Sequence, residues 1–182
     1  MDFIAGTDEV GRGCLAGPVV AAAVILKKRI DDLKDSKALS PKRRGELAKI
    51  ILDNSHYGFG LVSNQKIDEI NILNASLLAM KRAILNLPIK PTLVLVDGIH
   101  KPDLEISMRA IIGGDSSEDA ISAASIIAKV FRDDLMIKYE KKYPGYDFQN
   151  NKGYGTKYHL QALKDFGSCP IHRKTFKGVP TT

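Results

Sequence analysis

Short apolar runs, separated by amphipathic stretches, predict that strands and helices alternate along most of this chain. Apolar or β-branched runs predict strands near residues 3–5, 19–26, 57–62, 92–96 and 106–112. The second run contains only Val, Ala, Ile and Leu, which is typical of a buried strand. We therefore expect five strands.

Apolar residues at helical spacing predict the helices between and after these strands. Ser40 followed by Pro41 is a typical helix start, because the hydroxyl can cap the first turn and proline needs no N–H there. Helices are expected at residues 41–52, 67–84, 117–139 and 156–166. This order fits a mixed α/β sheet flanked by helices, in one domain over residues 1–182 with a C-terminal helical segment at about 140–182.

Composition adds a basic charge and excludes several classes of protein. The 182 residues include 27 Lys and Arg against 21 Asp and Glu, and the formal charge of +6 suits a partner made of phosphates. No apolar stretch reaches the roughly 20 residues that cross a bilayer, and no signal peptide begins the chain. Cys14 and Cys169 lack metal-ligand spacing, which favours free thiols in a reducing compartment. We expect a cytoplasmic protein with no membrane attachment.

Four carboxylates share one position relative to the predicted strands. Asp8, Glu9, Asp97 and Asp115 each end a predicted strand or lie in the turn after it. A single Asp is common in turns and at helix caps. Four carboxylates brought together repel one another unless protons or cations neutralise them, and Mg²⁺ and Mn²⁺ prefer such oxygen ligands. We expect a site for two such ions, which lie roughly 3.5–4 Å apart in enzymes that hydrolyse phosphodiesters.

Gly11-Arg12-Gly13 places bare backbone directly beside the first two carboxylates. A dinucleotide-binding Gly-x-Gly-x-x-Gly motif is excluded, because the next glycine is Gly17 and a predicted strand follows where that motif requires a helix. Glycine lets main-chain groups approach a ligand closely, so the turn is a candidate for ligand contact. The alternative is a turn needed only for folding. The four histidines form no triad with a serine, and we expect them to be structural.

Six segments together resemble one enzyme family. They are, in chain order, DEVGRG at 8–13, DSK at 35–37, INILNAS at 70–76, VDG at 96–98, GDS at 114–116 with ISAASIIAK at 121–129, and KGYGT at 152–156. The chain thereby resembles the type 2 ribonuclease H family, ribonuclease HII, over nearly its whole length. One such match would be weak evidence, whereas six in the family's order are strong evidence.

The resemblance implies a ribonuclease H-like fold with a five-stranded mixed sheet. It also implies a metal-dependent endonuclease that hydrolyses the RNA strand of RNA–DNA hybrids and nicks DNA 5′ to embedded ribonucleotides, leaving 5′-phosphate and 3′-hydroxyl ends. The four carboxylates would be the catalytic ligands of two Mg²⁺ or Mn²⁺ ions. The expected partners are RNA–DNA hybrid and DNA that contains ribonucleotides, and no protein partner is evident.

The resemblance also assigns contacts with the substrate. The backbone of Gly11, Arg12 and Gly13 would recognise the 2′-hydroxyl, which distinguishes RNA from DNA. Lys37 would contact a phosphate, and Tyr154 would stack at the RNA–DNA junction.

One position departs from the family's pattern, and two rival functions stay open. Gly113 stands before Gly114-Asp115 where the family usually has a basic residue, so the resemblance supplies no phosphate contact there. One rival is a module that binds hybrid without cutting it, against which the presence of all four carboxylates argues. The other is a different metal nuclease of the same fold, such as a junction resolvase, which would not require the Gly-Arg-Gly turn or Tyr154.

Overall fold

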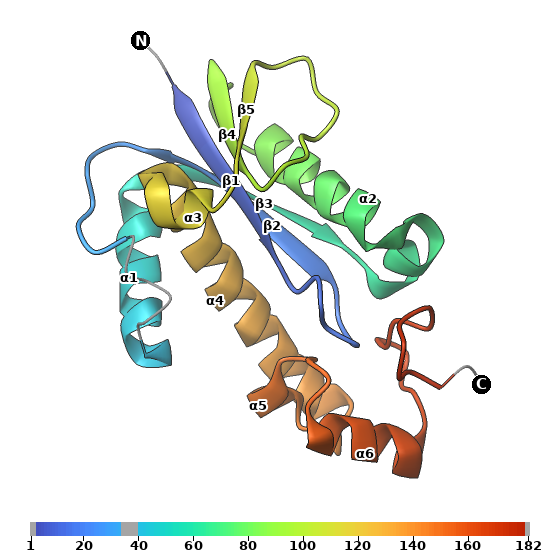
Figure 1. Ribbon diagram of the computed structural model, residues 1–182. Helices are drawn as coiled ribbons and strands as arrows, with labels where there is room; N and C mark the ends of the chain where they lie inside the picture. The colour runs from blue at the N-terminus through green and yellow to red at the C-terminus, as the bar shows by residue number, and fades with distance from the viewer. Residues whose placement is uncertain (1–2, 34–39, 181–182) are drawn as a thin grey trace.

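A mixed sheet of five strands organises the molecule in the computed structural model, which describes residues 3–33 and 40–180 (Figure 1). The sheet order is β3-β2-β1-β4-β5. The strands are β1 (Ile4–Val10), β2 (Val19–Leu26), β3 (Ser55–Val62), β4 (Leu93–Asp97) and β5 (Met108–Ile111). β1 is central, because it pairs antiparallel with β2 and parallel with β4. The predicted mixed sheet of five strands is confirmed.

Helices cover both faces of this sheet. α2 (Asn64–Leu85) packs on one face, and α1 (Pro41–Asp53) and α4 (Asp119–Lys142) pack on the other (Figure 1). The short helices are α3 (Gly114–Ser117), α5 (Phe148–Asn151) and α6 (Lys157–Phe166). As predicted, Ser40 caps α1, and its hydroxyl accepts the Arg43 N–H at 3.3 Å.

Small residues in the central strands let the helices approach the sheet. Ala21 and Ala23 of β2 pack towards α2, while Ala22 packs towards α1 and α4. A Cβ at Gly6 of β1 would lie 2.2 Å from the backbone of Ala120 in α4. Glycine is therefore required at residue 6, and the close approach of α4 brings this helix beside the end of β1.

β1 is longer than the sequence predicts. It continues through Asp8 and Glu9 to Val10, and it pairs Asp8 with Ala22 and Glu9 with Ala21 in an unbroken register. The backbone therefore stays in the strand at both carboxylates. Because side chains alternate along a strand, Asp8 faces α4 and Glu9 faces α2 at the same end of the sheet.

The helix predicted over 117–139 corresponds to α4, and a separate short helix, α3, precedes it. α3 ends at Ser117, and Glu118 has an extended backbone (φ −115°, ψ 118°) before α4 begins. Ser116 and Ser117 lie inside α3 and do not cap α4. The Ser117 hydroxyl instead donates back to the carbonyl of Gly113 at 3.5 Å. Asp115 consequently lies in the first turn of a short helix.

The C-terminal segment returns to the loop that follows β1. The N–H of Gly17 donates to the carbonyl of Ile171 at 2.9 Å, and the N–H of Arg173 donates to the carbonyl of Leu15 at 2.8 Å. Residues of α5 and α6 form a further apolar core with Leu15 and Met136. None of the described helices is long and apolar enough to cross a membrane.

Candidate active site

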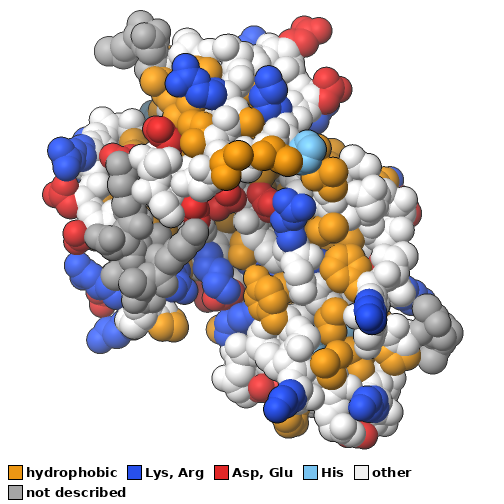
Figure 2. Space-filling model, in the orientation of Figure 1, with side chains coloured by type: hydrophobic (Ala, Val, Ile, Leu, Met, Phe, Trp, Pro, Cys, Tyr) orange, Lys and Arg blue, Asp and Glu red, His pale blue; other side chains and the backbone are white. Residues whose placement is uncertain are grey.

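Three of the four predicted carboxylates interact where β1 and β4 end. Asp8 is only 7% exposed, and burial raises its pKa well above the usual value, with the negative charges of Glu9 and Asp97 adding to the rise. Hydrogen bonds from the Ser125 side chain and from the Glu9 N–H, at 2.7 Å, act in the opposite direction. A cation bound here would stabilise the ionised carboxylates. Figure 2 shows Asp and Glu side chains gathered near the middle of this face, with Lys and Arg side chains close by.

Asp115 reaches the same edge of the sheet through α3. Oδ1 of Asp97 accepts the N–H of Gly114 at 2.8 Å, which fixes the start of α3 against the end of β4. Asp115 follows directly. Its Oδ1 accepts the Ser116 hydroxyl at 3.3 Å, and its carbonyl accepts the Ser122 hydroxyl. Asp115 therefore lies one residue after Gly114, whose N–H binds the carboxylate of Asp97.

These residues fit a hard divalent cation by their chemistry. Every donor is a carboxylate oxygen, which suits Mg²⁺ or Mn²⁺ better than the nitrogen and sulfur ligands of structural zinc. Within residues 3–33 and 40–180, no three His, Cys, Asp or Glu side chains are already arranged to hold an ion. Binding would therefore require these side chains to turn towards the ion.

The Gly-Arg-Gly turn depends on glycine at its first position. Gly11 has φ +92°, and a Cβ there would lie 2.1 Å from Nε of the buried Arg132. At Gly13 the nearest atom to a Cβ would be in the Tyr154 ring, 3.9 Å away. Arg12 and Gly13 are exposed. The structure thus places the turn and the predicted stacking tyrosine side by side.

Tyr154 is held by its backbone and keeps part of its ring in solvent. Its backbone pairs with that of Cys14, and Nζ of Lys129 lies 5.9 Å from the ring centroid. Tyr154 is 40% exposed. Partial burial raises the pKa of the Tyr154 hydroxyl. The ring is therefore accessible to a ligand that lies over the turn.

A cavity of about 330 Å³ opens on the α2 side of the carboxylates. Glu9, Arg12, Asp97 and Ser76 help to line it, and Nη1 of Arg12 pairs with Oε1 of Glu9 at 3.1 Å. Ser76 is 1% exposed, and its hydroxyl has no hydrogen-bond partner in the described part of the chain. A buried hydroxyl without a partner costs free energy, so its place beside the carboxylates makes it a candidate ligand contact.

Two predicted positions contribute less to this picture. Lys37 lies outside the described residues. Gly113 has φ +68° and caps α3, and nothing lies within 4 Å of a Cβ built there. The site therefore has open space where the resembled family usually places a basic side chain.

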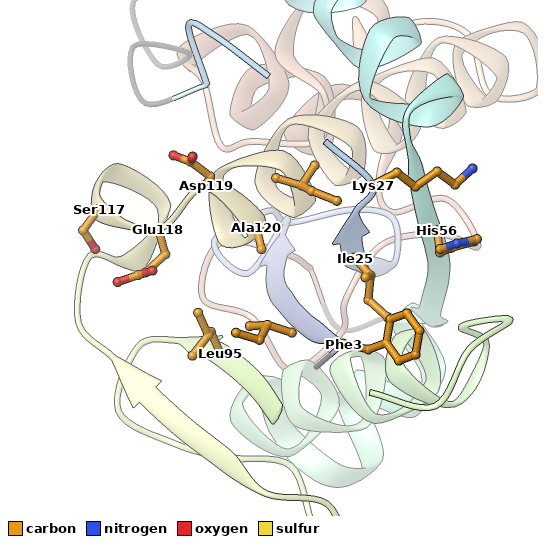
Figure 3. A pocket seen from close by; sticks show the side chains of 11 residues that line it. Phe3, Ile25, Lys27, His56, Leu95, Ser117, Glu118, Asp119 and Ala120 are labelled. Atoms are coloured by element: carbon orange, nitrogen blue, oxygen red, sulfur yellow. The ribbon is translucent and has the colours of Figure 1, made fainter. Parts of the chain in front are cut away.

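A separate cavity of about 650 Å³ lies at the other end of β1 (Figure 3). Its lining includes apolar Phe3 and Leu95, with Glu118 on one side and Lys27 and His56 on the other. None of the four predicted carboxylates lines it. We therefore do not include it in the candidate active site.

A pair of buried histidines, absent from the predicted site residues, supports Tyr154. Nε2 of His159 lies 2.9 Å from Nε2 of His172, Nδ1 of His159 lies 2.9 Å from the Tyr154 carbonyl, and the Cys169 N–H donates to Nδ1 of His172 at 2.9 Å. We assign two neutral rings, with His159 donating from Nδ1 and His172 donating from Nε2; Nδ1 of His172 then accepts the Cys169 N–H and does not donate to the Cys169 carbonyl, which lies 3.3 Å away. Burial lowers the pKa of both rings, that of His172 to about 4 with His159 as the second cause. The expected structural role fits, but no sequence signal predicted the pairing.

Two buried arginines also escaped prediction. Arg132 and Arg173 are 0% exposed and donate to main-chain carbonyls around the turn. Arg132 lies four residues after Ala128 and four before Met136, both of which are buried, so helical spacing could have placed it inside. Arg173 lies outside any helix or strand, where periodicity gives no signal.

Comparison with known proteins identifies one family. The family model for Ribonuclease HII matches residues 5–179. The Ribonuclease HII of Pelagibacter ubique is 54% identical over 182 residues, which cover 98% of this chain and 98% of that protein.

Solved structures show the same fold. The ribonuclease H2 from Pyrococcus horikoshii OT3 aligns with a TM-score of 0.83 at 30% identity, covering 96% of this chain and 94% of that one. The RNase HII in the PCNA:RNase HII complex from Archaeoglobus fulgidus aligns at 0.82 with 29% identity, covering 99% and 98%. Bst-RNase HIII in complex with Mn²⁺, at 18% identity and a TM-score of 0.72 over 97% of this chain and 68% of that one, shares the fold. With its ribonuclease H-like sheet and its match over residues 5–179, this chain belongs to the ribonuclease HII family and is a type 2 ribonuclease H.

Proposed function

We propose that this enzyme uses divalent metal ions to hydrolyse the RNA strand of RNA–DNA hybrids and to nick DNA 5′ to an embedded ribonucleotide. The products would carry 5′-phosphate and 3′-hydroxyl ends. Two Mg²⁺ or Mn²⁺ ions would be held by the four carboxylates Asp8, Glu9, Asp97 and Asp115. The observation that carries the proposal is the convergence of buried Asp8 with Glu9 and Asp97 at the ends of β1 and β4, where burial and the two neighbouring charges raise the pKa of Asp8. In a protein with a formal charge of +6, such local negative charge favours a bridging cation between carboxylates and phosphate.

Each part of the site has a separate role in this proposal. Bound ions would activate the attacking water and stabilise the leaving oxygen. The carboxylates would hold these cations at the end of the sheet and would balance their charge. The exposed backbone of Arg12 and Gly13 would contact the ribose 2′-hydroxyl, and the partly exposed Tyr154 ring would pack against the nucleotide that follows. Lys37 would hold a phosphate.

The test uses a labelled DNA duplex with one ribonucleotide. Cleavage by the wild-type protein should be lost in EDTA and restored by Mg²⁺ or Mn²⁺, and the cut should map 5′ to the ribonucleotide. Asp8→Asn and Asp97→Asn should abolish cleavage in the presence of Mg²⁺. Asp53→Asn, which changes an exposed carboxylate at the end of α1, is the matched control and should cleave normally. Binding of the duplex by the wild-type protein without any cleavage would instead support a binding module.

A further inference from the structure

All three guanidinium nitrogens of Arg173 donate to main-chain carbonyls in or near the Gly-Arg-Gly turn. Nη2 donates to the carbonyl of Gly11 at 2.6 Å, Nη1 to that of Arg12 at 2.8 Å, and Nε to that of Gly17 at 3.0 Å. The side chain is 0% exposed. Burial lowers the pKa of Arg173 to about 10, so the group stays charged at neutral pH. A buried charge is costly, and three charge-assisted hydrogen bonds offset part of that cost.

These bonds fix the direction of two amide groups. A peptide unit is planar and trans, so its N–H points away from its C=O. The Gly11 carbonyl shares its peptide unit with the Arg12 N–H, and the Arg12 carbonyl shares its unit with the Gly13 N–H. Because Arg173 holds both carbonyls towards the interior, both N–H groups point away from it. Neither N–H donates to any residue within 3–33 or 40–180, and both residues are exposed.

Arg132 supports the neighbouring part of the loop in a similar way. It donates to the carbonyls of Pro18 at 3.0 Å, Ala16 at 3.0 Å and Lys152 at 2.7 Å, and it is also 0% exposed. None of these carbonyls belongs to the Gly-Arg-Gly turn. Arg132 therefore resembles Arg173 in burial and in its number of bonds, but not in the peptide units that it orients.

We propose that Arg173 is a positioning residue for ribose recognition, which holds the Arg12 and Gly13 amides in the direction of the substrate's 2′-hydroxyl. This rests on the proposed contact between the turn and that hydroxyl. Arg173 itself touches no substrate. It acts by preorganising donors that would otherwise lose their direction when the turn relaxes.

The test compares Arg173→Lys with Arg132→Lys. Fluorescence anisotropy without divalent metal would measure binding to a DNA duplex with one ribonucleotide and to the same duplex made only of DNA. Arg173→Lys keeps the charge but lacks the fork of donors. It should reduce the preference for the ribonucleotide by about tenfold, the loss expected for about two hydrogen bonds, while affinity for the DNA duplex stays constant. Arg132→Lys, at a buried arginine that packs against Gly11 but binds no carbonyl of the turn, should lose clearly less of the preference than Arg173→Lys.

Each alternative outcome has a distinct meaning. An unchanged preference in Arg173→Lys, with a preference present in the wild-type protein, overturns the role of Arg173 alone. No preference in the wild-type protein overturns the ribose contact as well. If Arg173→Lys does not fold, a synthetic peptide of residues 169–182 with citrulline at position 173 can be ligated at Cys169 and compared with the arginine peptide. Citrulline keeps the shape but removes one donor group, so part of the preference should be lost, and full preference overturns the proposal.

Discussion

The buried pair of His159 and His172 predicts that acid weakens the fold at a defined place. Both rings are neutral in the hydrogen-bond network, with His159 donating to the Tyr154 carbonyl and His172 accepting from the Cys169 N–H. A proton added to the pair puts a second N–H between the two Nε2 atoms, which are 2.9 Å apart, or opposes the Cys169 N–H. Folding therefore excludes that proton.

The size of the effect follows from the pKa of His172. The folded pKa of about 4 is lower than the ordinary 6.5, so the unfolded chain binds more protons than the folded chain between these two pH values. The free energy of unfolding therefore decreases as the pH decreases. For one group, the free energy of unfolding should fall by about 2 kcal/mol between pH 7.5 and pH 5, and by about 3 kcal/mol at pH 4. The contribution is fully present above pH 6.5 and is lost as the pH falls towards the folded pKa.

Urea unfolding at a series of pH values measures this contribution. His172→Gln removes the titrating ring, so the difference in free energy of unfolding between the wild-type protein and this variant should shrink by about 2 kcal/mol from pH 7.5 to pH 5. Taking the difference cancels carboxylates common to both proteins, including Asp8. His100→Gln, at an exposed position, should follow the wild-type pH profile. A difference for His172→Gln that stays constant from pH 7.5 to pH 5 would refute the assignment of a neutral pair.

Four further predictions concern the candidate site. Asp8→Asn should raise the free energy of unfolding at pH 7, because the ionised carboxylate is buried beside Glu9 and Asp97, and this gain should vanish on acidification through the raised pKa of Asp8; a gain independent of pH would contradict it. Ser76→Ala should raise stability by about 1 kcal/mol and slow single-turnover cleavage, whereas Ser55→Ala, at the other buried hydroxyl without a partner in the described chain, should raise stability only; equal cleavage by both would exclude Ser76 from the site. Tyr154→Ala should lose more rate on a duplex with one ribonucleotide than on a uniform hybrid, and Tyr154→Phe should lose little, since stacking is worth roughly 1–3 kcal/mol per base; equal slowing on both substrates would assign the ring to packing. Lys37→Ala should lower the slope of log affinity against log salt by about one unit or less, and an unchanged slope would remove Lys37 from the contact surface.

The fold was largely predictable because its strands and helices have clear periodicity. The all-apolar run at 19–26 and the Ser40 cap gave β2 and the start of α1 nearly to the residue. Tertiary packing decided the rest. Cross-strand pairing with β2 extends β1 through Asp8 and Glu9, and an extended residue at Glu118 separates α4 from the short helix α3. Local sequence does not carry either effect.

Only those residues of the candidate site that belong to sequence motifs could be predicted. The motif positions named Asp8, Asp97 and Tyr154, and the structure brings the first two into electrostatic contact and places the third beside Gly13. The supporting groups were not predictable, since an Arg or His in the sequence is more often exposed than buried. Metal binding, the ribonucleotide contacts and the expected absence of a protein partner stay predictions.

The distance in sequence between Arg173 and the turn also orders events during synthesis. Arg173 is 161 residues from Arg12 and 162 from Gly11, whose carbonyls it binds. A ribosome makes Arg12 161 residues before it makes Arg173, so the carbonyls of the turn obtain these donors only after the intervening stretch has been translated. Until then the nascent chain lacks the hydrogen bonds from Arg173 that hold this turn. If the turn contacts the ribose as proposed, ribose recognition is complete only after Arg173 has been translated and has reached the turn.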